Sequence, residues 1–199
     1  MTIRNKSAFL AAACFSALLL SACGPGSPEA GRPNTAPPSG TAPTAPGSSS
    51  TPTVTPTGPP QRPAAANGLT LPAADAFYRY YIDLRNYAAR TGDTAPLVAE
   101  SEAGCEGCKE YIDYVKKVNA ANGGMTGEFD EKVKDVYQLA RGSTGRVGGK
   151  ALLAVGKYTV KESPSEKPAI VQPAEYIDSI ALSASGENWV MYETDLAEQ

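Results

Sequence analysis

Cys105 and Cys108 form a Cys-x-x-Cys pair, a spacing that suits a structural disulfide, a redox couple or half of a zinc site. Zinc would need two further ligands, and the 199-residue chain contains no histidine to supply them. Enzymes that use this motif for redox chemistry place it after a strand, whereas helical segments precede it here, and Glu106 disfavours a thiolate. The sequence therefore predicts a structural disulfide, with thiol–disulfide redox work as a weaker alternative.

Two carboxylates, Asp135 and Asp178, share parity with the apolar residues of predicted strands. Buried carboxylates are rare unless they are paired or functional, so each side chain has two interpretations. It is solvated or salt-bridged, for instance after a bulge that turns it outwards, or it lines a cavity. The first interpretation is favoured, and both residues stand as candidate cavity residues under the second.

The absence of histidine removes the commonest general base and the commonest metal ligand. Ser-His-Asp, Cys-His and histidine-based zinc chemistry are therefore excluded. The formal net charge of −3 comes without a cluster of lysine and arginine, so the chain gives no sign of a nucleic-acid surface. No catalytic residue, metal site or cofactor is predicted.

Residues 1–22 have the organisation of an export signal. Arg4 and Lys6 precede an apolar run over residues 8–20, which is shorter than the roughly 20 residues of a membrane-spanning helix. The next residues, Leu20-Ser21-Ala22-Cys23, resemble the lipobox of bacterial lipoproteins. This resemblance implies cleavage after Ala22 and a diacylglyceryl group on the Cys23 sulfur, which would anchor the mature protein to the outer face of the cell membrane.

Residues 23–68 are predicted to be a disordered linker. Twelve of the chain's 17 prolines fall between Pro25 and Pro63, among threonine, serine, alanine and glycine. Such a segment buries too little apolar surface to offset the entropy lost on ordering. We expect it to hold a single domain, residues 69–199, away from the bilayer.

The periodicity of residues 69–199 predicts an α+β domain with helices packed on a curved, mainly antiparallel four-stranded sheet. Helices are expected at 71–90, at about 94–98 and at about 105–122. Strands are expected at about 129–139, 149–162, 169–183 and 188–196, and Pro173 predicts an edge or a bulge in the third strand. Tyr81 and Tyr111 are expected in the core. An exposed contact patch that includes Tyr78 and Tyr80 is a less favoured interpretation of the first helix.

Several motifs resemble those of known proteins. The segments 76–81, 91–93 and 97–98, with the strand around Trp189, resemble the cone-shaped fold of the nuclear transport factor 2 superfamily. The sequences Tyr80-Tyr81-Ile82-Asp83-Leu84, Thr91-Gly92-Asp93-Thr94-Ala95-Pro96-Leu97 and Gly104-Cys105-Glu106-Gly107-Cys108 are similar to an uncharacterised family of actinobacterial lipoproteins. The resemblance implies a helix-on-sheet fold, in which a central cavity can form, and it implies no activity.

These observations predict a membrane-anchored, extracytoplasmic protein of the cell envelope. The favoured function is a non-enzymatic module that binds an envelope partner, either a protein or a small ligand. The alternative is a small-ligand receptor or an acid/base enzyme that uses the cavity of a cone-type fold. Redox work at Cys105 and Cys108 is the weaker alternative.

Overall fold

The structure is a computed structural model that describes residues 58–121 and 124–199. The predicted export signal, Cys23 and most of the predicted linker lie outside these residues. Within the described part of the chain, no helix is both long enough and apolar enough to cross a membrane.

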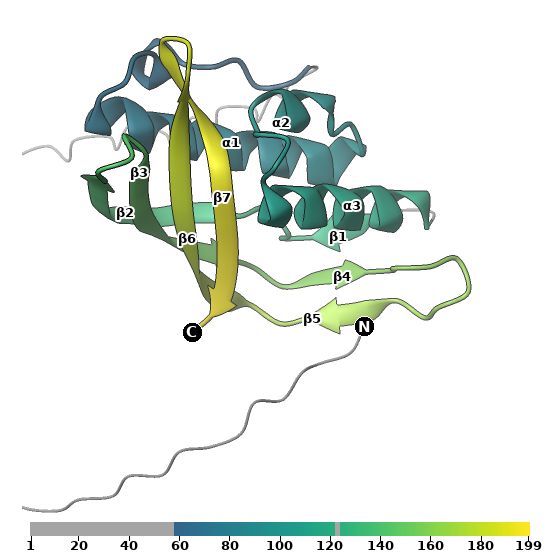
Figure 1. Ribbon diagram of the computed structural model, residues 1–199. Coiled ribbons are helices and arrows are strands. Elements are labelled where there is room, and N and C mark those ends of the chain that lie inside the picture. The colour runs from purple at the N-terminus through teal and green to yellow at the C-terminus, as the bar shows by residue number, and fades with distance from the viewer. Residues whose placement is uncertain (1–57, 122–123) are drawn as a thin grey trace, which may run out of the picture. The chain divides into compact units, whose positions relative to one another are not determined.

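The described chain has a mixed α+β fold, as its periodicity predicted, with helices first and antiparallel strands after them (Figure 1). In chain order its elements are η1 (Ala64–Ala66), α1 (Leu71–Thr91), α2 (Ala95–Ala99), α3 (Glu106–Ala120), β1 (Met125–Gly127), β2 (Lys132–Arg141), β3 (Val147–Val155), β4 (Tyr158–Val160), β5 (Ala169–Val171), β6 (Ala174–Ser185) and β7 (Asn188–Glu198). The three predicted α-helices are present, each within two residues of its expected bounds.

Helix α1 begins and ends on local signals. The Thr70 side chain accepts a hydrogen bond from the Ala73 N–H at 3.2 Å, and Pro72 occupies the first turn, where its missing N–H costs nothing. Gly92 ends the helix with φ at 75°, a left-handed conformation that glycine adopts without strain. These signals lie within a few residues of each helix end, so the sequence alone predicts both bounds.

Helix α1 is buried over most of its circumference, so Tyr78 and Tyr80 form no exposed patch and the less favoured interpretation of these two residues is wrong. Tyr78 is 0% exposed and Tyr80 is 7% exposed. The Arg62 guanidinium lies 5.6 Å from the Tyr80 ring centroid and forms an ion pair with Glu100. Residues 58–68 thus pack against the helix, with Ala66 fully buried, so the packed part of the chain begins before the expected boundary at residue 69.

The strands form two antiparallel sheets, of which the sequence predicted one. The strand orders are β2-β3-β6-β7 and β1-β4-β5. The expected strands at 149–162 and 169–183 each divide, at Gly156 and near Pro173, and both pairs of halves stay hydrogen-bonded as β3 with β6 and β4 with β5. One long hairpin therefore bends and contributes to both sheets.

Close packing at Gly156 accompanies this bend. A Cβ atom there would lie 2.5 Å from the Glu128 side chain. The Gly156 N–H donates to the Glu128 carbonyl at 2.9 Å, and the Glu128 N–H donates to the Lys157 carbonyl at 3.0 Å. The residues just after β1 thus cross the hairpin where its strands change sheets.

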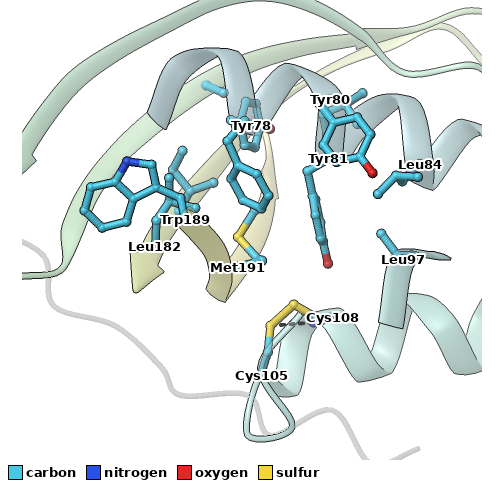
Figure 2. Packing of buried hydrophobic residues seen from close by; sticks show 14 of the residues in the cluster. Tyr78, Tyr80, Tyr81, Leu84, Leu97, Cys105, Cys108, Leu182, Trp189 and Met191 are labelled. Atoms are coloured by element: carbon cyan, nitrogen blue, oxygen red, sulfur yellow. Dashed lines mark hydrogen bonds between the residues drawn. A yellow bond between two sulfur atoms is a disulfide. The ribbon is translucent and has the colours of Figure 1, made fainter. Parts of the chain in front are cut away.

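The core joins α1 to the long strands β6 and β7, which α1 crosses in Figure 1. Tyr78 and Tyr81 of α1 belong to the same buried cluster as Met191 and Trp189 of β7 (Figure 2). The Trp189 indole N–H donates to the Thr70 carbonyl at 3.0 Å, which ties the start of α1 to β7. The core thus fixes α1 across the sheet, and the start of α3 packs at the edge of the same core.

Candidate functional site

A pocket of about 570 Å³ opens between α1, α3 and β7. Arg85 and Tyr81 line it from α1, Tyr111 and Tyr114 from α3, and residues 193–196 from β7. Cavities of roughly 300–1,000 Å³ are typical of small-molecule sites. The pocket is therefore large enough to enclose a small ligand or one or two side chains of a peptide.

The wall formed by α3 depends on Gly107. A Cβ atom at this position would lie 1.8 Å from the Thr194 carbonyl oxygen, so only glycine lets the helix start so close to β7. The Gly107 N–H also donates to Glu193 Oε1 at 3.3 Å. The start of α3 is thus held directly against the backbone of β7.

The disulfide lies beside this contact. Cys105 and Cys108 form the predicted bridge, and the Cys105 sulfur accepts the Cys108 N–H at 3.2 Å as the cap of α3 (Figure 2). Each cysteine is only 2% exposed, which keeps the sulfur atoms from an external thiol. The bridge therefore stiffens one side of the pocket.

Arg85 forms part of the pocket floor, although its side chain is only 3% exposed. Its NH2 donates to Glu131 Oε1 at 2.7 Å, and its guanidinium carbon lies 4.1 Å from the Tyr111 ring centroid. The Tyr111 hydroxyl in turn donates to the Arg85 carbonyl at 3.1 Å. The guanidinium is therefore held by one carboxylate and by stacking on one aromatic face.

Asp178 completes the charged cluster behind the pocket. It is 0% exposed, and it accepts hydrogen bonds from the Tyr78 hydroxyl at 2.9 Å and from the Thr194 hydroxyl at 2.7 Å. Arg85 NH1 lies 3.5 Å from its Oδ2. Thr194 lines the pocket, so the Asp178 carboxylate lies one side chain away from it. We call Tyr78, Arg85, Glu131, Asp178 and Thr194 the Arg85 cluster.

Burial dominates the electrostatics of the Arg85 cluster. It raises the pKa of Asp178, which the Arg85 charge and the hydrogen bonds from Thr194 and Tyr78 only partly offset. Burial also raises the pKa of Glu131, against the opposing effect of Arg85. For Arg85, burial lowers the pKa, but the Glu131 carboxylate and the Tyr111 and Asp178 groups outweigh it, so the pKa is raised and the guanidinium stays charged.

Three polar atoms of this cluster have no hydrogen-bond partner among the described residues. They are Nε and NH1 of Arg85 and Oε2 of Glu131. Buried polar groups are nearly always satisfied, because an unmade bond costs about 1–3 kcal/mol. The Arg85 cluster therefore retains unmet donor and acceptor capacity, at atoms that are themselves buried beneath the floor of the pocket.

The mouth of the pocket is acidic. Glu106, Glu110, Glu193 and Asp195 line it, whereas Arg85 is the one basic residue in the lining of this pocket. Across the described residues, no three acidic, cysteine or histidine side chains converge as a metal site would require. The carboxylates therefore surround the opening without forming an ion cage.

The structure separates the two candidate carboxylates. Asp178 is buried, as its parity indicated, but it lies behind Thr194 and does not line the pocket itself. Asp135 does not line the pocket, the less favoured of its two interpretations, because β2 has a register shift between Val133 and Asp135 and the side chain is exposed. Its Oδ1 accepts the Val136 N–H at 2.9 Å instead.

Sequence reasoning missed Arg85 and Glu131, the two residues that give the floor its charge. A signal for Arg85 was present, because it follows Tyr78 by seven residues and Tyr81 by four, on the same face of the helix. A charged residue on an apolar helical face is a candidate for a buried pair. No comparable local pattern marks Glu131, which precedes β2.

Comparisons with solved structures give likenesses at low identity. The intermembrane space region of the chloroplast protein ARC6 is 14% identical with a TM-score of 0.49, over 64% of this chain and 95% of that chain. A putative scytalone dehydratase from Novosphingobium aromaticivorans is 11% identical with a TM-score of 0.46, over 66% of this chain and 87% of that chain. Similarity at this level assigns no function to the chain.

Sequence comparison is more decisive about the family. No curated protein sequence matches the chain significantly. Residues 46–194, which are 149 of the 199, match the family described as "Family of unknown function (DUF6318)". This range spans every helix and all but the last residues of β7. The chain therefore belongs to the DUF6318 family of unknown function.

Proposed function

We propose that this protein is a lipid-anchored, extracytoplasmic binding module whose ligand occupies the pocket between α1, α3 and β7. The single observation that carries this proposal is the floor of the pocket, where a charged arginine is buried and two of its nitrogen atoms, Nε and NH1, make no hydrogen bond to any described residue. Burying such a group is costly unless it is satisfied, so a site that retains one is suited to a ligand that supplies the missing acceptor.

Binding fits this geometry better than acid/base catalysis. A general acid or base must reach the proton that it transfers, within about 3 Å or through one water. Both Asp178 oxygens accept hydrogen bonds from other side chains, and the carboxylate lies behind Thr194. Asp135 is exposed and does not line the pocket, so it is not placed to transfer a proton there. The carboxylates predicted as candidates thus serve structure rather than proton transfer.

Anchoring outside the membrane is supported by the N-terminal sequence alone. The residues Leu20 to Cys23 resemble a lipobox and follow a short apolar run, and they lie outside the described residues. Two acyl chains on Cys23 would hold the protein stably on a bilayer, where one chain gives marginal binding.

The anchoring is tested by Cys23→Ser in the native host. We expect the wild type to carry lipid at the N-terminus of its mature chain and to fractionate with membranes. The variant should carry no lipid. Absence of lipid from the wild-type protein would contradict the proposal.

The binding site is tested by native mass spectrometry of the full chain purified from its native host. Leu196 lines the pocket and is 38% exposed, so Leu196→Trp fills part of the pocket with a larger side chain. Ile170→Trp is the matched control, because Ile170 is exposed on β5, away from the pocket. We expect a bound mass on the wild type and on Ile170→Trp that is lost from Leu196→Trp. Equal retention by both variants would overturn the proposed site.

A further inference from the structure

The charge around the pocket indicates which ligand it accepts, an inference that rests on the proposed binding function. Four carboxylates line the mouth, and three of them, those of Glu106, Glu110 and Asp195, belong to exposed residues. Clefts lined by one sign of charge concentrate ligands of the opposite sign. Because the carboxylates do not converge on a metal-sized site within the described residues, an extended organic cation suits them better than an ion.

The walls suit the same ligand. Tyr111 and Tyr114 of α3 and Tyr81 of α1 face the pocket, and Leu196 adds apolar surface from β7. One face of the Tyr111 ring is occupied by the Arg85 guanidinium at 4.1 Å, which leaves the other aromatic surface of the wall to a ligand. Burial raises the pKa of Tyr81 to about 12, so its hydroxyl stays neutral and adds no charge. An alkyl chain with a cationic head is complementary to such a wall.

The floor adds a requirement for an acceptor. Arg85 lines the pocket with a side chain that is only 3% exposed, and its Nε and NH1 make no hydrogen bond to any described residue. Both atoms are buried, so an acceptor reaches them when neighbouring side chains shift on binding. The Arg85 guanidinium already has two carboxylates beside it, Glu131 at 2.7 Å and Asp178 at 3.5 Å. A ligand carboxylate at the same guanidinium would be repelled by both of them. A neutral carbonyl oxygen meets no such repulsion, so it is the better acceptor.

From these three features we infer that the pocket binds an amide-bearing organic cation, with its ammonium or guanidinium group at the acidic mouth and a carbonyl oxygen directed to Arg85. This is the chemistry of a basic peptide segment. A free amino-acid amide shares the chemistry, so a peptide probe and a lysinamide probe distinguish the two sources.

The test is calorimetric titration of the full chain in detergent micelles with four probes. They are the capped tetrapeptide Gly-Lys-Lys-Gly, its diglutamine and diglutamate counterparts, and lysinamide. We expect the dilysine peptide to bind at least tenfold more tightly than the diglutamine peptide, and the diglutamate peptide to give no heat. Raising the salt from 0.05 to 0.5 M should weaken the dilysine complex, since screening reduces attraction at an exposed mouth.

Matched variants locate the effect. Glu110→Gln combined with Asp195→Asn removes two charges at the mouth and should weaken the dilysine peptide at least fivefold. Glu166→Gln combined with Glu175→Gln removes the same charge from exposed positions elsewhere and should leave the affinity unchanged. All four substitutions are at exposed residues, so the fold is retained. Equal weakening by both pairs would show a general charge effect and overturn the inference.

The remaining outcomes separate this inference from the proposed function. If the diglutamine or diglutamate peptide binds more tightly than the dilysine peptide, the cation inference is overturned. If that binding is also lost in Leu196→Trp, the pocket remains the ligand site. Binding of none of the four probes would also overturn it, while the bound mass from the native host still decides the proposed function. Equal affinity for lysinamide and the dilysine peptide would identify a free amide as the source of the ligand.

Discussion

Replacing Arg85 with methionine should lower the free energy of unfolding by about 3–5 kcal/mol at pH 7.5. Methionine keeps most of the side-chain volume but removes the cation that pairs with Glu131 at 2.7 Å and with Asp178 at 3.5 Å. Removing one partner of a buried ion pair leaves an uncompensated charge, which typically costs about 3–5 kcal/mol. The loss should therefore be far larger than for an ordinary surface substitution.

The loss should also depend on pH. Burial already raises the pKa of both Glu131 and Asp178, so these carboxyls bind protons more readily in the folded chain than in the unfolded chain. Their contribution to stability is full below the ordinary carboxyl pKa and is lost as pH rises through the raised value. Without Arg85 both values rise further. The difference between Arg85→Met and wild type should therefore shrink from pH 7.5 to pH 5.

Urea unfolding followed by tryptophan fluorescence measures this difference. Trp189 is the single tryptophan of the chain and is fully buried, so its emission reports global unfolding. Arg79→Met is the matched control on the same helix, because Arg79 pairs with Asp75 at the surface and should lose about 0.5 kcal/mol or less. The reasoning is refuted if Arg85→Met loses no more than Arg79→Met, or if its loss is the same at both pH values.

Three further substitutions test how the site is held. Gly107→Ala places a Cβ atom 1.8 Å from the backbone of β7 and should cost about 1–3 kcal/mol in urea unfolding, whereas Gly104→Ala, with no atom within 4 Å, should be neutral; equal effects would count against the close approach. The double substitution of Cys105 and Cys108 by alanine opens a very short loop and should cost about 2 kcal/mol by the loop-entropy relation; a loss above about 5 kcal/mol would contradict a merely local clamp. Tyr78→Phe removes a buried hydrogen bond to a carboxylate and should cost about 1.5–3 kcal/mol; an unchanged midpoint would show that this bond adds nothing.

The helices were predictable because their signals are local. Thr70, Pro72 and Gly92 specify the bounds of α1 through contacts within four residues. The Cys-x-x-Cys spacing likewise brings Cys105 and Cys108 within one turn, at a Cα separation of 5.3 Å. Local sequence signals were therefore sufficient to predict the α-helices and the disulfide.

The pocket could not be predicted in the same way, because its floor joins residues that are distant in sequence. Arg85, Glu131 and Asp178 come from α1, from the segment before β2 and from β6. Their proximity follows from how the helix crosses the sheet, which periodicity does not specify. The shift in β2 that exposes Asp135 and the bend of the hairpin at Gly156 are likewise set by tertiary packing. The burial of Tyr80 was not predictable either, because the segment that covers it was expected to be a linker.

The most direct test of the proposed binding site is a crystal structure of the protein purified from its native host. We predict ordered density between α1, α3 and β7, with an acceptor atom of the ligand within about 3.2 Å of Nε or NH1 of Arg85. A pocket filled by its own side chains, or a ligand bound elsewhere on the molecule, would contradict the proposal.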